Sequence, residues 1–154
     1  NRDAMGKFNS SVNNIYQELT GVLGNAVSSM PAYFNNTIYY GAVGDTIKAF
    51  TISGAKVSIG PSFQSSNSFT YPGATPSISA NGRSSAVLWA VENTSQAVLH
   101  AYDATNLHEL YNSNQASGGR DQFGNGNKYI TPLVVNGKVY VGTTNSIGVF
   151  GLLP

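Results

Sequence analysis

The chain has 154 residues, of which 41% are hydrophobic and only 10% are charged, and its formal net charge is +1. An average soluble domain has roughly 25% charged residues. Proteins that bind nucleic acid or an anionic membrane surface carry clustered Lys and Arg, which this chain lacks, so we expect neither partner. The absence of cysteine excludes a disulfide and a thiolate metal site within the chain.

The polarity of the chain comes from Asn, Ser, Thr and Gly rather than from charge. These residues favour turns and exposed strand faces, which is typical of all-β proteins. Together with the low charge they predict an extracytoplasmic bacterial protein, periplasmic or secreted. The chain begins with Asn rather than Met, which predicts a processed chain or a piece of a longer one.

Three segments of the chain repeat one pattern: a proline, a short apolar strand, an Asn turn, a second strand, a polar hairpin and a third strand. They begin at Pro31, Pro76 and Pro132, spaced 45 and 56 residues apart. Propeller repeats have about this length, roughly 40–50 residues, and one repeat cannot bury its apolar face alone. The repeats therefore predict antiparallel sheets that pack on one another.

Alternating apolar residues around turn residues predict a hairpin in each repeat. The expected strands are residues 37–43 and 46–52, 86–91 and 97–103, and 138–143 and 147–151. A fourth strand is expected at residues 56–59 and again at residues 109–112. The connectors 60–75 and 113–129 are rich in Gly, Ser and Asn and are predicted to be loops. In the opening segment 1–24, "NNIYQEL" fits a short helix, but its position favours an outer strand.

The segment "AYDATNLHELY", residues 101–111, resembles the blade signature of quinoprotein-type propellers, the PQQ-like repeat family. Ala101, Asp103 and Tyr111 match at the right spacing, whereas Asn106 and Leu107 replace Thr-Gly and Tyr replaces the closing Trp. Asp103 is suited to accept backbone N–H bonds in the turn, and the aromatic residue to dock between blades. "NRDAMGKF" at the start looks like a worn copy of the signature, and the segment from Thr131 onward is similar to a last blade.

This resemblance implies an all-β fold, a propeller segment of about three four-stranded antiparallel blades completed by oligomerisation. The expected divisions are an outer strand within 1–28, blades at 29–60 and 74–113, and a final blade at 130–154 without its outer strand. Propellers typically have about four to eight blades. We therefore expect either a homodimer, in which exchanged N-terminal strands complete a six-bladed ring, or further blades on a longer parent chain.

Quinoprotein dehydrogenases of this family hold pyrroloquinoline quinone between a tryptophan and a vicinal disulfide, above a calcium ion. This chain has no cysteine, and its single tryptophan, Trp89, lies in a predicted strand. We therefore expect neither the quinone nor calcium as a cofactor. Asp121, Asn125 and Asn127 also lack the regular ligand spacing of an EF-hand loop, so no metal site is expected.

One face of the propeller would gather the loop 118–128 and the turns of the other sheets. We expect a ligand there, held by the charged side chains that the loops contribute: Arg120, Asp121, Lys128, Asp45 and Glu92. An alternative interpretation is that Arg120 and Asp121 only pin their loop by pairing with neighbours. His100 and His108 are eight residues apart without an acidic residue at zinc-ligand spacing, so structural roles are expected.

The sequence contains no nucleophile elbow and no phosphate loop. The favoured function is a non-catalytic binding or scaffolding module. The alternative is an enzyme or a piece of one, either a quinoprotein-like oxidoreductase or a hydrolase with a site at the channel mouth. No residue is assigned a catalytic role.

Overall fold

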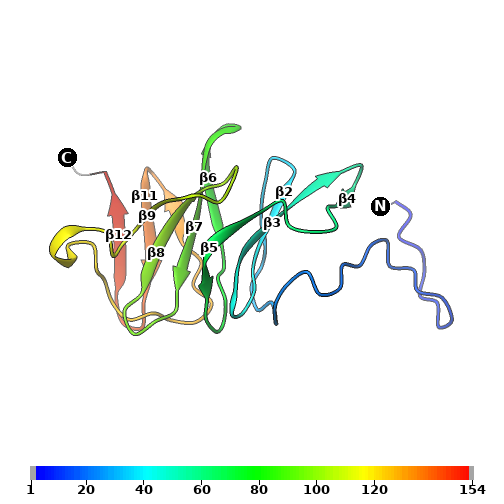
Figure 1. Ribbon diagram of the computed structural model, residues 1–154, viewed down its shortest axis with the longest axis horizontal. Coiled ribbons are helices and arrows are strands. Elements are labelled where there is room, and N and C mark those ends of the chain that lie inside the picture. Colours follow the sequence, from blue (N-terminus) through cyan, green and yellow to red (C-terminus); the bar gives the residue numbers. More distant parts are fainter. Residues whose placement is uncertain (1–2, 153–154) are drawn as a thin grey trace.

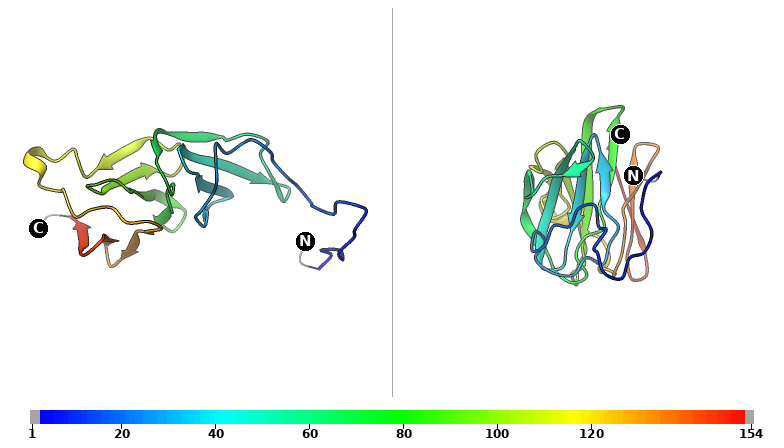
Figure 2. Two further views of the ribbon diagram at one scale, coloured as in Figure 1. Left: turned by 90° about the horizontal axis from the view of Figure 1, so that it is seen from below. Right: turned by 90° about the vertical axis from the view of Figure 1, so that its right-hand side faces the viewer.

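The computed structural model describes residues 3–152 of the chain. Three antiparallel sheets follow one another along the molecule in sequence order, and Figures 1 and 2 show them packed in succession beside an N-terminal segment that extends from the first sheet. The predicted all-β fold of about three antiparallel sheets is confirmed and is compatible with a partial propeller. The sheets have five, four and three strands, so the first has one strand more than the four expected. The first two residues of "NRDAMGKF" and the last two of the final blade lie outside the described residues.

The first sheet has the order β1-β2-β3-β4, with β5 paired to β3. Its strands are β1 (Ala32–Phe34), β2 (Thr37–Gly41), β3 (Asp45–Ser53), β4 (Lys56–Val57) and β5 (Phe63–Phe69). The predicted hairpin is confirmed, but the loop expected at 60–75 is wrong because it contains β5. The sequence of β5 is mostly polar, and only Ser65 and Phe69 of this strand are buried, so hydrophobic alternation did not indicate it.

The second sheet, of order β6-β7-β8-β9, matches its predicted strands closely. It consists of β6 (Ser77–Asn81), β7 (Ser84–Glu92), β8 (Val98–Asp103) and β9 (Glu109–Asn112). The third sheet consists of β10 (Leu133–Val135), β11 (Lys138–Gly142) and β12 (Ile147–Gly151). The connector between the two sheets is a loop, as predicted, apart from one short 3-10 turn (η1) at Ser117–Gly119.

In the single chain, the described part of the N-terminal segment contains no helix and pairs with no sheet as a strand, so the outer strand expected within 1–28 stays a prediction. One side chain of the segment bonds to the edge of the first sheet: the amide oxygen of Gln17 accepts from Val57 N at 2.9 Å and its nitrogen donates to Val57 O at 2.7 Å. A few apolar residues of the segment also cover the outer face of the first sheet. They enclose a cavity of about 200 Å³, lined among others by Leu19, Val22, Leu23, Ile38, Tyr40 and Phe50.

Sheets 1 and 2 pack face to face through fully buried apolar side chains. The core between them contains Tyr39, Ile47, Ala49, Phe69, Leu88, Ala90 and Tyr102, among others. The hydroxyl of Tyr39 reaches across this interface and donates to Ala104 O at 2.7 Å. A second cluster, with Leu99 from β8 and Val141 from β11 at its centre, joins sheet 2 to sheet 3.

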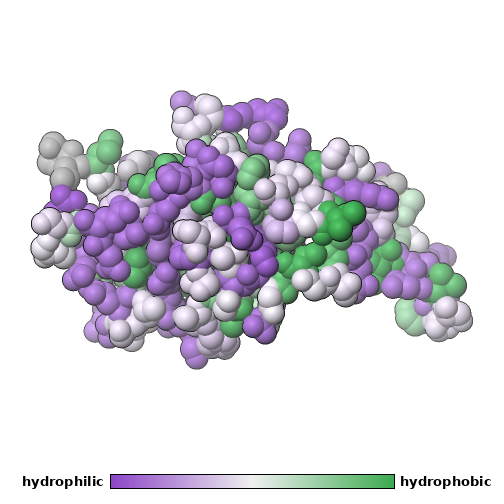
Figure 3. Space-filling model, in the orientation of Figure 1, coloured by the Kyte–Doolittle hydropathy of each residue, from purple (hydrophilic) through white to green (hydrophobic). Residues whose placement is uncertain are grey.

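The surface carries both polar and apolar regions. In Figure 3 the face over β8 and β9 is mostly hydrophilic, and the hydrophobic residues in view gather towards the N-terminal segment. That segment exposes several large apolar side chains, namely Met5, Phe8, Val12, Ile15 and Tyr16.

Candidate functional site

A cleft of about 710 Å³ lies between sheets 2 and 3. Its wall on sheet 2 is a row across three strands, because Ala101 of β8 lies opposite Trp89 of β7 and Tyr111 of β9. Both aromatic side chains line the cleft, and Ala101 between them is buried. Its remaining surface includes Val134, Val139 and Phe150 from sheet 3 and the polar residues Ser79, Asn81 and Ser85.

Arg120 and Asp121 close one end of the cleft as a two-pronged ion pair. Arg120 Nε donates to Asp121 Oδ1 at 2.7 Å and Nη2 donates to Oδ2 at 2.8 Å. The hydroxyl of Tyr111 donates to the same carboxylate at 2.6 Å. The loop is therefore pinned by pairing between neighbours, which agrees with the alternative interpretation of these two residues.

Hydrogen bonds set the protonation states of this group. The bonds from Arg120 and then from Tyr111 lower the pKa of Asp121 to about 2. Burial and the adjacent Asp121 carboxylate raise the pKa of Tyr111 to about 12. At neutral pH the pair therefore consists of a full positive and a full negative charge beside a neutral phenol, and its net charge is zero.

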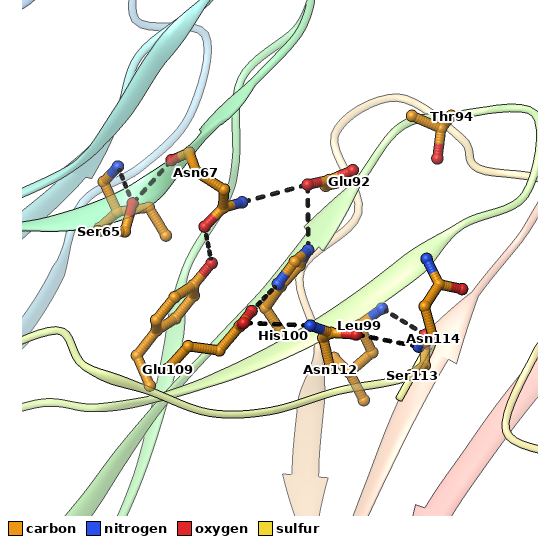
Figure 4. A network of polar contacts seen from close by, with 12 residues as sticks. Ser65, Asn67, Glu92, Thr94, Leu99, His100, Glu109, Asn112, Ser113 and Asn114 are labelled. Carbon is orange, nitrogen blue, oxygen red and sulfur yellow. Dashed lines mark hydrogen bonds and ion pairs between the residues drawn. The ribbon is translucent and has the colours of Figure 1, made fainter. Parts of the chain in front are cut away.

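A second polar group, drawn in Figure 4, lies between sheets 1 and 2 around His100 of β8. The imidazole is buried, with Nδ1 2.5 Å from Glu109 Oε1 and Nε2 3.1 Å from Glu92 Oε1. Asn67 of β5 donates to Glu92 Oε1 at 3.1 Å and accepts a hydrogen bond from the Tyr102 hydroxyl. Figure 4 shows these side chains converging from both sheets, so the group bridges the interface.

The geometry favours a charged imidazole, because an ionised carboxylate only accepts hydrogen bonds and one lies at each ring nitrogen. Burial opposes this charge, but the hydrogen bonds to Glu92 and Glu109 outweigh it and raise the pKa of His100. The bond from His100 is the main cause that lowers the pKa of Glu92. The ring of Tyr102 stacks on the imidazole at a centroid distance of 5.7 Å and shields one side of it.

The five predicted site residues do not form one group. Asp45 accepts from Gly24 N at 2.7 Å and from Lys48 Nζ at 2.8 Å, which fixes the N-terminal segment to the first sheet. Glu92 belongs to the His100 group, and Arg120 and Asp121 to the cleft. Lys128 lies elsewhere, with Nζ 5.1 Å from the ring centroid of Tyr71.

Loop packing explains part of this separation. The segment 124–126 does meet the turns of sheets 2 and 3, because Ala97 N donates to Gly124 O at 3.0 Å and Thr144 N to Asn125 O at 3.1 Å. Arg120 and Asp121 precede this contact and turn towards Tyr111 instead. The prediction that these loops gather on one face therefore holds for the second half of the loop only.

The described residues include no group of three or more His, Asp or Glu side chains arranged to hold a metal ion. Asp121 is already occupied by Arg120 and Tyr111, and His100 by two carboxylates. In residues 3–152 no helix has the length and apolar character needed to cross a membrane.

Sequence reasoning considered the pairing of Arg120 with Asp121 but missed the His100 group and the bond from Tyr111, because it compared positions along the chain. Hairpin register was the available signal: Ala90 pairs with His100 in the β7–β8 ladder, so Glu92 lies diagonally next to His100 on the same face. The same ladder places Trp89 beside Ala101. The contribution of Asn67 could not be found this way, because β5 was expected to be a loop.

No known protein-family model matches the chain, and no curated protein matches it significantly in sequence.

Proposed function

We propose that this chain is a propeller segment that acts as a non-catalytic, extracytoplasmic scaffolding or binding module, and that its third sheet packs against the first sheet of a second copy. The proposal rests on the apolar outer face of sheet 3. This face belongs to β10 and β12, and its side chains are Leu133, Val135, Ile147 and Val149, all of them exposed.

A comparison of equivalent residues in the three repeats indicates that this face is suited to contact another sheet. The third strand of each repeat carries a small apolar residue opposite an aromatic one: Ala49 opposite Tyr39, Ala101 opposite Trp89, and Val149 opposite Tyr140. Ala49 is 0% exposed under sheet 2 and Ala101 is 3% exposed under sheet 3, but Val149 is 54% exposed. The residue at this position is therefore buried wherever another sheet follows, as for Ala49 and Ala101.

The opposite face of each sheet is the one that packs against the preceding sheet. Tyr102 of sheet 2 packs towards sheet 1, and Phe150 of sheet 3 towards sheet 2. The corresponding residue in sheet 1 is Phe50, which lies under Leu23 and its neighbours in the N-terminal segment rather than under another sheet. The chain thus carries both halves of one further interface at its two ends, and two copies can satisfy both halves in a closed ring.

The charged groups also favour a scaffold over an enzyme. Asp45, Glu92, Arg120 and Asp121 are each engaged by neighbouring side chains in ways that fix loops and sheets. A catalytic site needs a nucleophile, base or acid that is free to reach a substrate.

Light scattering on the purified chain tests the proposal, and we expect a mass of two chains. Ile147→Asp places a charge on the outer face of sheet 3 and is expected to give a folded monomer. Leu110→Asp is the matched control, because Leu110 is 53% exposed and belongs to β9 of sheet 2, which supplies neither end face, so this variant should remain dimeric. A wild-type monomer, or open-ended polymers, would contradict the closed dimer.

A further inference from the structure

We propose that the cleft between sheets 2 and 3 binds a neutral carbohydrate. It offers an aromatic wall, a polar end and no net charge, and this combination fits a ring compound with an apolar face and many hydroxyl groups. The inference does not depend on self-association, because the row of residues that forms the wall belongs to sheet 2 alone.

The wall of the cleft on sheet 2 is aromatic. Trp89 and Tyr111 lie on one face of sheet 2, on either side of the small Ala101. Neighbouring strands lie about 4.8 Å apart, so the two side chains stand roughly 10 Å apart across the sheet. Both are partly exposed to the cleft, and their polar atoms are held in place, since Trp89 Nε1 donates to Ser79 Oγ at 2.9 Å and Tyr111 is bound to Asp121. A rigid aromatic surface binds an apolar ring face at little cost in side-chain entropy.

The polar end has unused hydrogen-bonding capacity. Asp121 Oδ1 accepts only from Arg120 Nε, and a carboxylate oxygen can accept about two hydrogen bonds. The Arg120 side chain is 60% exposed, and its fork offers five N–H donors, of which the carboxylate uses two. On the opposite side of the wall, Ser79 of β6 accepts from the indole of Trp89 and keeps its own O–H to donate. Donors and acceptors thus stand side by side, as a hydroxyl group requires.

The ion pair of Arg120 with Asp121 disfavours charged ligands. An anion at Arg120 would meet Asp121, and a cation at Asp121 would meet Arg120, because the two groups form one planar pair. A neutral polar ligand binds to both groups without breaking the pair. The volume of about 710 Å³ falls within the range of roughly 300–1,000 Å³ that is usual for small-ligand sites.

The single tryptophan makes the test direct, because Trp89 lines the cleft and no other residue contributes indole fluorescence. The probes are pentasaccharides: cellopentaose, maltopentaose, mannopentaose and N-acetylchitopentaose as neutral chains, pentagalacturonate as an anion and the chitosan pentamer as a cation. We expect a saturable change of Trp89 fluorescence with at least one neutral probe, and weaker or no binding of both charged ones.

Two variants of the pair sharpen the result. Asp121→Asn leaves Arg120 without its counter-charge, so the neutral probe should bind at least about tenfold more weakly while pentagalacturonate gains affinity. Arg120→Gln should show the mirror image, with a gain for the chitosan pentamer, and the exposure of Arg120 makes loss of folding an unimportant concern. Glu18→Gln removes one exposed carboxylate from the N-terminal segment and serves as the matched control with unchanged binding.

Three results would overturn the proposal: no fluorescence response to any neutral probe at millimolar concentration, tighter binding of a charged probe by the wild-type chain, or a folded Asp121→Asn variant that binds the neutral probe as the wild type does.

Discussion

The two interfaces between sheets are built from equivalent strands, yet one is closed and the other is open. Between sheets 1 and 2, Phe69 is 1% exposed, and the charged group around His100 forms hydrogen bonds from one sheet to the other. Between sheets 2 and 3 the apolar cluster around Leu99 fills the middle of the interface, and the cleft remains beside Trp89 and Tyr111.

Strand number accounts for the difference. Sheet 1 has β5 beside β3, and this strand supplies both Phe69 and Asn67 to the interface. In sheet 3, within the part of the chain that the structure describes, β12 is paired with β11 only. The outer part of sheet 2 around Tyr111 therefore has no facing strand, and this leaves the cleft. The comparison shows that a facing strand decides whether the space between two sheets is filled or left as a cleft.

Truncating one aromatic residue in each interface should give the largest difference in stability between the two interfaces. Phe69→Ala removes a fully buried ring and should lower the free energy of unfolding by about 4 kcal/mol. Phe150→Ala removes a ring that borders the cleft and is only partly buried, so we expect about 2 kcal/mol. Urea denaturation of both variants measures this, and equal losses would mean that the second interface is as tightly packed as the first.

The His100 group should make the first interface sensitive to pH, and His100→Gln should cost about 2 kcal/mol near pH 6. The raised pKa of His100 means that its contribution is complete below the unfolded value of 6.5 and is lost as pH rises through the folded pKa. The lowered pKa of Glu92 means that its contribution is complete above 4.5 and is lost as pH falls through the folded pKa. The stabilisation is therefore greatest between these two values.

Melting temperatures measured across this pH range test the prediction. His100→Gln should flatten the profile, because it removes the titrating group. His108→Gln provides the control, since His108 is exposed in the turn that follows β8. A profile for His100→Gln with the same shape as that of the wild type would show that the group does not control the interface.

The smallest effect is expected outside both interfaces, at the turn after β8. Asp103 Oδ1 accepts from Thr105 N at 2.7 Å and from Thr105 Oγ1 at 2.6 Å. Asp103→Ala should lower the free energy of unfolding by about 1 kcal/mol through the loss of these turn bonds. Asp103→Asn keeps an acceptor in place and should lose less. Thermal melts of the two variants check the order, and a loss as large as that of Phe69→Ala would contradict a purely local role.

The sequence by itself determined the repeats and most of their strands. Pro31, Pro76 and Pro132 marked the starts of three sheets, and turn residues such as Gly44, with a φ of +67°, fixed the hairpins between alternating strands. The turn role predicted for Asp103 followed from the same local chemistry. These features depend on neighbours along the chain, so local pattern was sufficient to find them.

Only the tertiary structure decided which residues meet between sheets. The strand β5 is too polar to be recognised locally and is held by contacts with β3, such as the hydrogen bond that Ile47 N of β3 donates to Ser65 Oγ of β5 at 2.9 Å. Gln17 fixes the N-terminal segment to the first sheet through bonds to Val57, a residue 40 positions away. The charged residues expected at one site separate into the cleft, the His100 group and surface contacts, because each pairs with the nearest opposite charge or donor that packing provides. Such pairings depend on how sheets stack, and stacking brings together residues whose distance along the chain carries no information.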